Sequence, residues 1–309
     1  MKNIIIYTHM HNFSFIDGGT VVQYNLAKLL DDYGQNVRIY PSSGIKTSNS
    51  IFSKFYNNDF PIDDNTVVIY CEGTQGNPLN AKNVVRWLLS EMGKNAPYDY
   101  VNGWGKNELV YYFNFETAFS NKEEMIGKKY KLLTCIYINP IIQNYNNTIR
   151  KGYCHTFRKC HWHKTLKYAH PRNSFELKKE HKLIDCVNIF NKREIFISYD
   201  PLTFLNIIAA MCGCISVVIK VDGIPTHSEW LKTTAVYSYL KDKNIDKLYG
   251  IAYGISEVQW AKDTMPLVTQ QWTDILEYCK MKTLVPFLLD IAVFDTINAE
   301  NTIENIFFK

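Results

Sequence analysis

Short apolar runs alternate with amphipathic stretches along the chain. In the first half, residues 4–8, 36–40 and 66–71 are rich in Ile, Val and Tyr, as buried parallel strands are. The stretch 18–33 instead places its apolar residues at helical spacing, and Gly34 follows it, which suits the left-handed position after a helix. This order predicts an α/β fold that opens with a strand–helix–strand unit.

The same alternation continues to the end of the chain. We expect further strands at 109–115 and 130–138, and helices at 80–92, 182–191, 264–278 and 283–296. The pair Asn139-Pro140 is typical of the exit from a strand, and a domain boundary is placed there. The predicted organisation is a Rossmann-like domain at 1–140, a second Rossmann-like domain at 141–280 and a closing helical segment at 281–309.

The stretch from Phe196 to Ile219 has the clearest pattern. A short apolar strand is followed by Asp200, a good N-cap residue, and by Pro201, which suits the first position of a helix. The helix is expected to end at Gly213, and residues 215–219 form a second β-branched strand. A helix that begins just past a strand directs its N–H groups toward the carboxyl edge of the sheet, where anionic ligands bind.

Two parts of this stretch carry a resemblance. Asp200-Pro201 and the run Ala209-Ala210-Met211-Cys212-Gly213 resemble the two halves of a motif in nucleotide-sugar glycosyltransferases of the GT-B fold, as in viral and bacterial enzymes of glycan synthesis. Ile208 departs from the pattern, because it occupies the place of the family's second acid, which holds the nucleotide ribose. Asn206 or Thr203 is an alternative ribose contact, and an ordinary βαβ unit is the alternative to the motif.

The resemblance implies an α/β protein of the GT-B type, with two facing Rossmann-like domains and a C-terminal helix that crosses back. It implies that 1–140 binds the acceptor, that 141–280 binds the nucleoside-diphosphate sugar, and that Tyr199 and Asp200 contact this donor. The implied reaction transfers the sugar to a glycan or other hydroxyl acceptor without a metal or another cofactor. A non-catalytic nucleotide- or sugar-binding module and a nucleotide-sugar epimerase of the same fold remain alternatives. Retention and inversion both remain open.

The most basic stretch of the chain, residues 150–164, holds the predicted diphosphate contacts. Arg158 and Lys159 follow a predicted strand at 153–157, and the resemblance assigns the donor diphosphate to them. Fixed cations there stabilise the charge that the leaving diphosphate gains. Two cysteines and three histidines of this stretch offer a zinc alternative: Cys154, His155, Cys160, His161 and His163. Their spacing is not that of structural zinc pairs, and a basic strand edge is the simpler interpretation.

Glycines and carboxylates follow two strands of the first half. Gly18 and Gly19 resemble the Gly-Gly turn that lets the backbone approach the donor phosphates, and a tight turn is the alternative. Deprotonation of an acceptor hydroxyl needs a general base. Glu72 and Asp17 are the predicted catalytic residues, and His11 is a further candidate. Interaction with a helix dipole or hydrogen bonding within a loop is the alternative for Glu72.

Composition limits the partners. The formal charge of +4 is mild, whereas nucleic-acid binding usually needs a clustered basic stripe. The 21 Tyr and 17 Phe supply rings of the kind that line sugar sites.

We expect no membrane span and no signal peptide, because every apolar run is too short. Reduced cysteines and a cytoplasmic location are therefore expected, with a nucleotide sugar and a hydroxyl acceptor as partners. The oligomeric state is left open.

Overall fold

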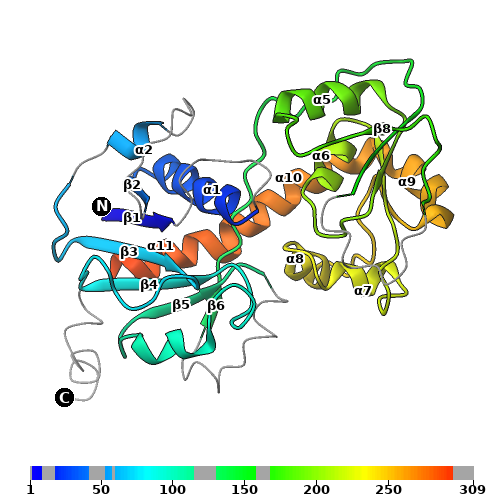
Figure 1. Cartoon of the computed structure of the whole chain (residues 1–309). Coiled ribbons are helices and arrows are strands. Elements are labelled where there is room, and N and C mark those ends of the chain that lie inside the picture. Colours follow the sequence, from blue (N-terminus) through cyan, green and yellow to red (C-terminus); the bar gives the residue numbers. More distant parts are fainter. Residues whose placement is uncertain are drawn as a thin grey trace. The chain divides into compact units, whose positions relative to one another are not determined.

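A computed structural model describes residues 2–8, 18–41, 53–57, 60–114, 130–157 and 168–294. The chain divides into two compact units, shown in Figure 1. The first unit joins Met1–Tyr137 to Tyr278–Lys309, and the second is Ile138–Glu277. The sequence placed its boundaries close to these divisions, at 140 and 280.

The first unit is built on a six-stranded sheet in the order β2-β1-β3-β4-β5-β6. Its strands are Asn3–Thr8 (β1), Asn36–Pro41 (β2), Thr66–Cys71 (β3), Asn83–Leu88 (β4), Leu109–Tyr112 (β5) and Tyr130–Leu132 (β6). All neighbouring pairs are parallel. The strand order reverses at β1, which lies between β2 and β3.

Alternate residues of this sheet belong to two different cores. Ile4 and Ile6 share one core with residues of α1 (Gly18–Asp32), α2 (Ser53–Asn57) and α11 (Val285–Ala292). Ile5 and Tyr7 share the other with Val68, Tyr70 and Ala81. Since successive side chains of a strand point to opposite faces, the sheet is buried on both sides. Through Phe287 and Ile291, α11 is part of the first of these cores.

The second unit contains a five-stranded sheet in the order β11-β10-β9-β7-β8. Its strands are Tyr153–Thr156 (β7), Phe175–Glu176 (β8), Ile195–Ser198 (β9), Ile215–Val218 (β10) and Ile251–Tyr253 (β11). Its helices are Leu183–Lys192 (α5), Leu205–Met211 (α6), His227–Leu231 (α7), Tyr237–Asp242 (α8), Val258–Thr264 (α9) and Val268–Cys279 (α10). All pairs are again parallel, so both units are consistent with a Rossmann-like α/β fold.

The prediction of a helix at 80–92 is wrong, because this segment contains strand β4. All six residues of β4 are buried between the parallel strands β3 and β5. Asn80, the expected N-cap, has a positive φ of 48° instead of the extended conformation of an N-cap. Val84, Val85 and Trp87 suit a strand that is covered on both faces.

The helix after β9 begins later than expected. Asp200 does not cap a helix at Pro201; its Oδ1 accepts the backbone N–H of Leu202 at 3.0 Å, which makes a local turn. The helix α6 starts only at Leu205. Two short strands, β8 and β11, were not predicted, because strands of two or three residues leave no periodic pattern.

The end of α6 is as predicted. Gly213 has a φ of +80°, and its N–H donates to the carbonyl of Ala210 at 2.9 Å. The N–H of Cys214 donates to the carbonyl of Ala209 at 2.9 Å. These two bonds make the Schellman motif, which satisfies the last carbonyls of a helix.

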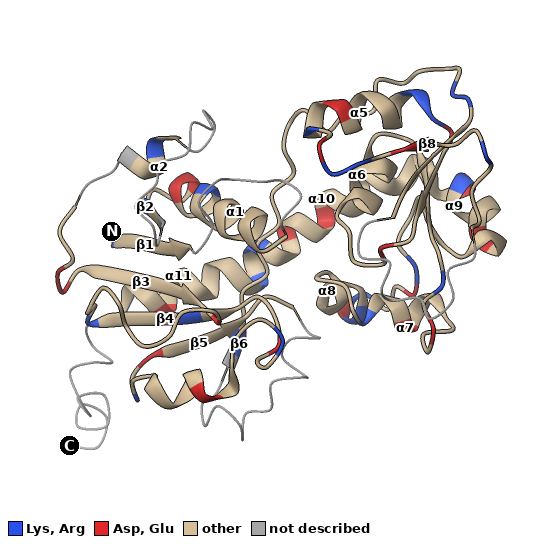
Figure 2. Ribbon diagram, viewed as in Figure 1, with Lys and Arg blue, Asp and Glu red and all other residues tan. Residues whose placement is uncertain are grey.

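Acidic and basic residues are interspersed along the described helices and loops of both units, as Figure 2 shows. Over the same part of the chain, every helix is too short or too polar to span a bilayer. The cysteines that the structure describes are free thiols.

We expect Gly213→Ala to destabilise the protein more than Gly34→Ala. Both glycines follow helices with positive φ, so each substitution costs about 1 kcal/mol of strain. A Cβ at Gly34 would meet nothing within 4 Å, whereas one at Gly213 would lie 2.8 Å from Arg150 Nη2. That guanidinium donates to the carbonyls of Phe190 and Cys212, and displacing it adds about 1–3 kcal/mol. Equal losses in urea unfolding would contradict this.

Candidate functional site

The strand order of the second unit directs attention to the carboxyl ends of β7 and β9. Ligands of open parallel sheets bind at this edge, where the order reverses. Thr156 of β7 pairs with Ser198 of β9, so the residues that follow them lie side by side. The rings of Phe157 and Tyr199 stack with centroids 5.0 Å apart. Tyr199 was predicted as a donor contact.

Two histidines join these rings. His155 and His170 stack nearly parallel, with centroids 3.7 Å apart and planes at 8°. The Nδ1 of His170 lies 2.8 Å from the Tyr199 hydroxyl, and that of His155 lies 2.9 Å from Ser174 Oγ. We call the aromatic group at this edge the switch-point cluster: His155, Phe157, Tyr168, His170 and Tyr199.

The cluster is electrically neutral near pH 7. Burial, and then repulsion from His170, lower the pKa of His155. Burial also lowers the pKa of His170 and raises that of Tyr199. Tyr168 is 71% exposed, Phe157 and His170 are half-buried, and His155 and Tyr199 are buried. The accessible part of the cluster therefore consists of the uncharged rings of Phe157, Tyr168 and His170, which suit a ring system better than an anion.

The turn after β9 and the start of α6 hold three more of the predicted donor contacts, Asp200, Thr203 and Asn206, and their side chains bond to the turn and to β10. The Nδ2 of Asn206 donates to the Asp200 carbonyl at 3.3 Å, and its Oδ1 lies 3.4 Å from Ser216 Oγ. Thr203 Oγ1 accepts the N–H of Leu205 at 3.4 Å. Asn206 is buried, and so is Ile208, which replaces the expected second acid. These contacts brace the turn beside the cluster.

Several predicted residues lie outside the described residues: Asp17, His11, Arg158, Lys159 and the zinc candidates Cys160, His161 and His163. Within the described part, no three His, Cys, Asp or Glu side chains are grouped to hold a metal ion. Gly18 and Gly19 open α1. A Cβ at Gly18 would meet nothing within 4 Å, so no described neighbour requires a glycine there.

Glu72 lies at the carboxyl end of β3 and is almost fully buried. Its Oε2 accepts the N–H of Leu89 at 2.9 Å, and it also bonds to the backbone of Ser90 and the side chain of Asn95. Burial raises the pKa of Glu72 despite these bonds. The carboxylate of Glu72 thus links the end of β3 to the loop after β4. This is a structural role, as in the hydrogen-bonding alternative to catalysis.

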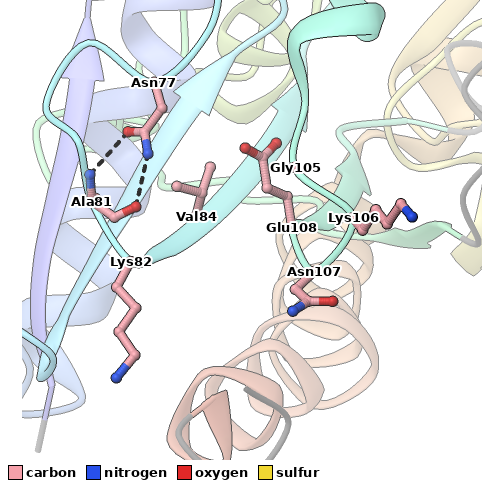
Figure 3. Close-up of a pocket in the computed structure, with 8 residues that line it drawn as sticks. All are labelled: Asn77, Ala81, Lys82, Val84, Gly105, Lys106, Asn107 and Glu108. Atoms are coloured by element: carbon pink, nitrogen blue, oxygen red, sulfur yellow. Dashed lines mark hydrogen bonds between the residues drawn. The ribbon is translucent and has the colours of Figure 1, made fainter. Parts of the chain in front are cut away.

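A hollow of about 400 Å³ lies in the first unit, and Figure 3 shows its lining. It borders the amino ends of β4 and β5, the edge opposite the one where such sheets bind ligands. The carboxylate of Glu108 lines the hollow and accepts hydrogen bonds from Nε and Nη2 of Arg86, at 2.7 and 3.1 Å. Arg86 is fully buried and also donates to the carbonyls of Thr74 and Gly76. We assign this pair a structural role.

No protein-family model matches the chain, and no curated protein is significantly similar to it. Its function is therefore argued from the residues and their geometry.

The carboxyl edge of the second unit also holds a pair that the sequence did not reveal. His227, at the start of α7, lies with its Nδ1 2.6 Å from Oε2 of Glu257. Glu257 stands 30 positions away in the chain, so no spacing rule links the two residues. The only sequence signal is a histidine soon after the turn that follows β10.

We expect Glu108→Ala to lower the free energy of unfolding by about 3–5 kcal/mol, because it leaves the buried Arg86 charge without its partner. The double variant Arg86→Met/Glu108→Leu should lose less, since no buried charge remains. Glu91→Ala is the control, because its ion pair with the exposed Lys94 is accessible to solvent and contributes at most about 1 kcal/mol. A double variant less stable than Glu108→Ala would refute the assignment.

We expect the free energy of unfolding to fall as the pH drops below about 6.5. The folded-state pKa values of His155 and His170 are lowered, so the unfolded chain takes up protons first and gains stability relative to the native state. Above that pH these residues contribute no slope. Urea unfolding between acidic and neutral pH checks this. The variant His155→Asn/His170→Asn should show a shallower slope, and an unchanged slope would contradict the cause given.

Proposed function

We propose that this protein is a glycosyltransferase of the GT-B type that uses a nucleoside-diphosphate sugar. The observation that carries the proposal is the switch-point cluster. It lies at the ligand-binding edge of a parallel sheet, and the chain continues from Phe157 directly into Arg158 and Lys159. Asp200 and Pro201 follow Tyr199 of the same cluster, so both halves of the predicted donor site begin at adjacent strand ends.

In this proposal, neutral rings and fixed cations act on different parts of the donor. The accessible rings of the cluster, those of Phe157, Tyr168 and His170, contact the flat faces of the nucleotide or sugar, as aromatic side chains do in ligand sites. Arg158 and Lys159 hold the diphosphate and stabilise its charge as the glycosidic bond breaks. These cations take the place of a metal ion, and no cofactor is required.

The acceptor hydroxyl must lose a proton during transfer, and Glu72 and Asp17 are the proposed catalytic residues. A buried carboxyl with a raised pKa suits proton transfer near neutral pH. Glu72 would have to release the N–H of Leu89 to act as a base. The role of Glu72 can be tested with Glu72→Gln, because this substitution keeps the shape of the side chain but removes its basicity.

A second candidate is a non-catalytic module that binds a nucleotide or a sugar. Two observations favour it. Buried Ile208 stands in place of the expected acid, and the carboxylate of Glu72 is already hydrogen-bonded within its own unit.

A panel of uridine, guanosine and thymidine diphosphate sugars separates the candidates. Each donor is incubated with the protein, with and without hydroxyl acceptors, and released nucleoside diphosphate is measured. Release that depends on an acceptor supports transfer. Conversion of one free donor into another indicates epimerisation, and binding without turnover indicates the module. No binding of any donor would refute the proposal.

The variant Arg158→Ala/Lys159→Ala should weaken donor binding by about 100-fold or more, because two charge-assisted contacts to the diphosphate are lost. The thermal midpoint should change little, since charged side chains seldom contribute to a core. Lys178→Ala/Lys179→Ala is the matched control, because it removes two exposed cations of the same unit. Equal donor affinity in the two variants would remove Arg158 and Lys159 from the site.

A further inference from the structure

The pair formed by His227 and Glu257 contains a buried nitrogen without a partner. His227 is 4% exposed. Its Nε2 finds no hydrogen-bond partner among the residues that the structure describes. A buried polar atom left unpaired destabilises a fold by about 1–3 kcal/mol, so such an atom calls for a specific explanation.

The position of the proton follows from the partners of Glu257. Its Oε2 also accepts the N–H of Tyr253 at 3.0 Å, and its Oε1 lies 3.3 Å from Lys247 Nζ. Against the effect of burial, the bonds from Tyr253, His227 and Lys247 hold the pKa of Glu257 below its ordinary value. Burial lowers the pKa of His227. Near neutral pH, Nδ1 therefore carries the proton and donates a hydrogen bond to the Glu257 carboxylate, and Nε2 is a bare acceptor.

The polar side-chain atoms of Trp230 and Tyr253 are engaged elsewhere. The indole N–H of Trp230 donates to the carbonyl of Pro201 at 3.0 Å. The hydroxyl of Tyr253 donates to the carbonyl of Ile224 at 2.8 Å and accepts the N–H of Val221 at 2.9 Å. Satisfying Nε2 from within this group would break one of these bonds. A hydrogen-bond donor on a ligand would pair with Nε2 and leave these bonds intact.

Aromatic rings surround the imidazole. The ring centroids of Trp230, Tyr253 and Trp260 lie 5.2, 6.1 and 6.2 Å from that of His227. Trp260 is half-buried, and the ammonium of Lys247 lies 5.1 Å from the centroid of its ring. Aromatic walls with one acceptor suit a ligand that presents C–H groups on one side and a hydroxyl on another. A sugar ring has this chemistry.

We propose that this group is a sugar subsite in which Nε2 of His227 accepts a hydrogen bond from one hydroxyl of the bound sugar. Glu257 is the positioning residue that fixes the tautomer, and Trp260 with Lys247 forms a cover that moves to admit the ligand. The bond between Trp230 and Pro201 connects the subsite to the Asp200-Pro201 turn. The choice of a sugar rests on the proposed function, whereas binding at Nε2 does not require that transfer occurs.

Nuclear magnetic resonance of protein labelled with ¹⁵N-histidine tests this in the unaltered chain. The probes are the diphosphate sugars named above, the methyl glycosides of their sugars and the corresponding nucleoside diphosphates. The Nε2 resonance of His227 should start at the position of an unbonded acceptor. It should move upfield with at least one sugar probe and stay in place with the nucleoside diphosphates. His181, which contacts Lys178, serves as the reference histidine and should not respond.

Monodeoxy analogues of the responding sugar then locate the hydroxyl. One analogue should bind about 10-fold to 100-fold more weakly than the parent, because it leaves Nε2 unpaired. In His227→Phe, which keeps an aromatic ring, parent and analogue should bind equally. A merely structural role for His227 would not remove this discrimination.

Two results would overturn the subsite. The first is an Nε2 resonance that no sugar moves up to high millimolar concentration. The second is a resonance already hydrogen-bonded in the free protein and unchanged by sugars, which would assign the position to a bound water. Acceptor-dependent release of diphosphate with a silent Nε2 would support the proposed function and refute the subsite. A response of Nε2 to sugars without any sugar transfer would support the subsite and refute the proposed transferase function.

Discussion

Parallel strand pairing is the constraint on which the arrangement of both units depends. Every described strand pair of the two sheets runs in the same direction, so all carboxyl ends of a sheet meet at one edge. The strand order reverses beside β1 and beside β7, and successive connections diverge there. In the second unit this brings Phe157 against Tyr199 and makes room for the stacked histidines. The chemistry of the site is thus a consequence of strand direction and order.

Buried polar groups distinguish structural residues from candidate functional ones. Arg86, Glu72 and Asn206 are buried, and each has hydrogen-bond partners in its own unit. Each links segments that the sheet alone would not hold together, because an unpaired group at these positions would be costly. Nε2 of His227 differs, since it has no described partner and the polar side-chain atoms of Trp230 and Tyr253 are engaged with other groups. The contrast identifies an acceptor that folding leaves unused.

Local sequence chemistry predicted those elements whose signal lies within a few residues. The apolar runs of β1, β3 and β9, the helix α1 and the glycine that ends α6 are where the pattern indicated. The same local logic was wrong at 80–92, because a helix-like N-cap residue precedes six residues that the sheet buries on both faces. It was also wrong at Asp200, where an aspartate side chain can equally close a turn. Propensity yields to tertiary burial in the first case and to a competing local bond in the second.

The sequence by itself determined the α/β class and most strand positions, because both depend on the periodicity of apolar residues. Only the tertiary structure decided which strand ends are neighbours, and hence that His155, His170 and Tyr199 form one cluster. It alone paired His227 with Glu257 and Arg86 with Glu108. These contacts join residues that are distant in the chain, and they arise from strand order and burial, which no local pattern encodes.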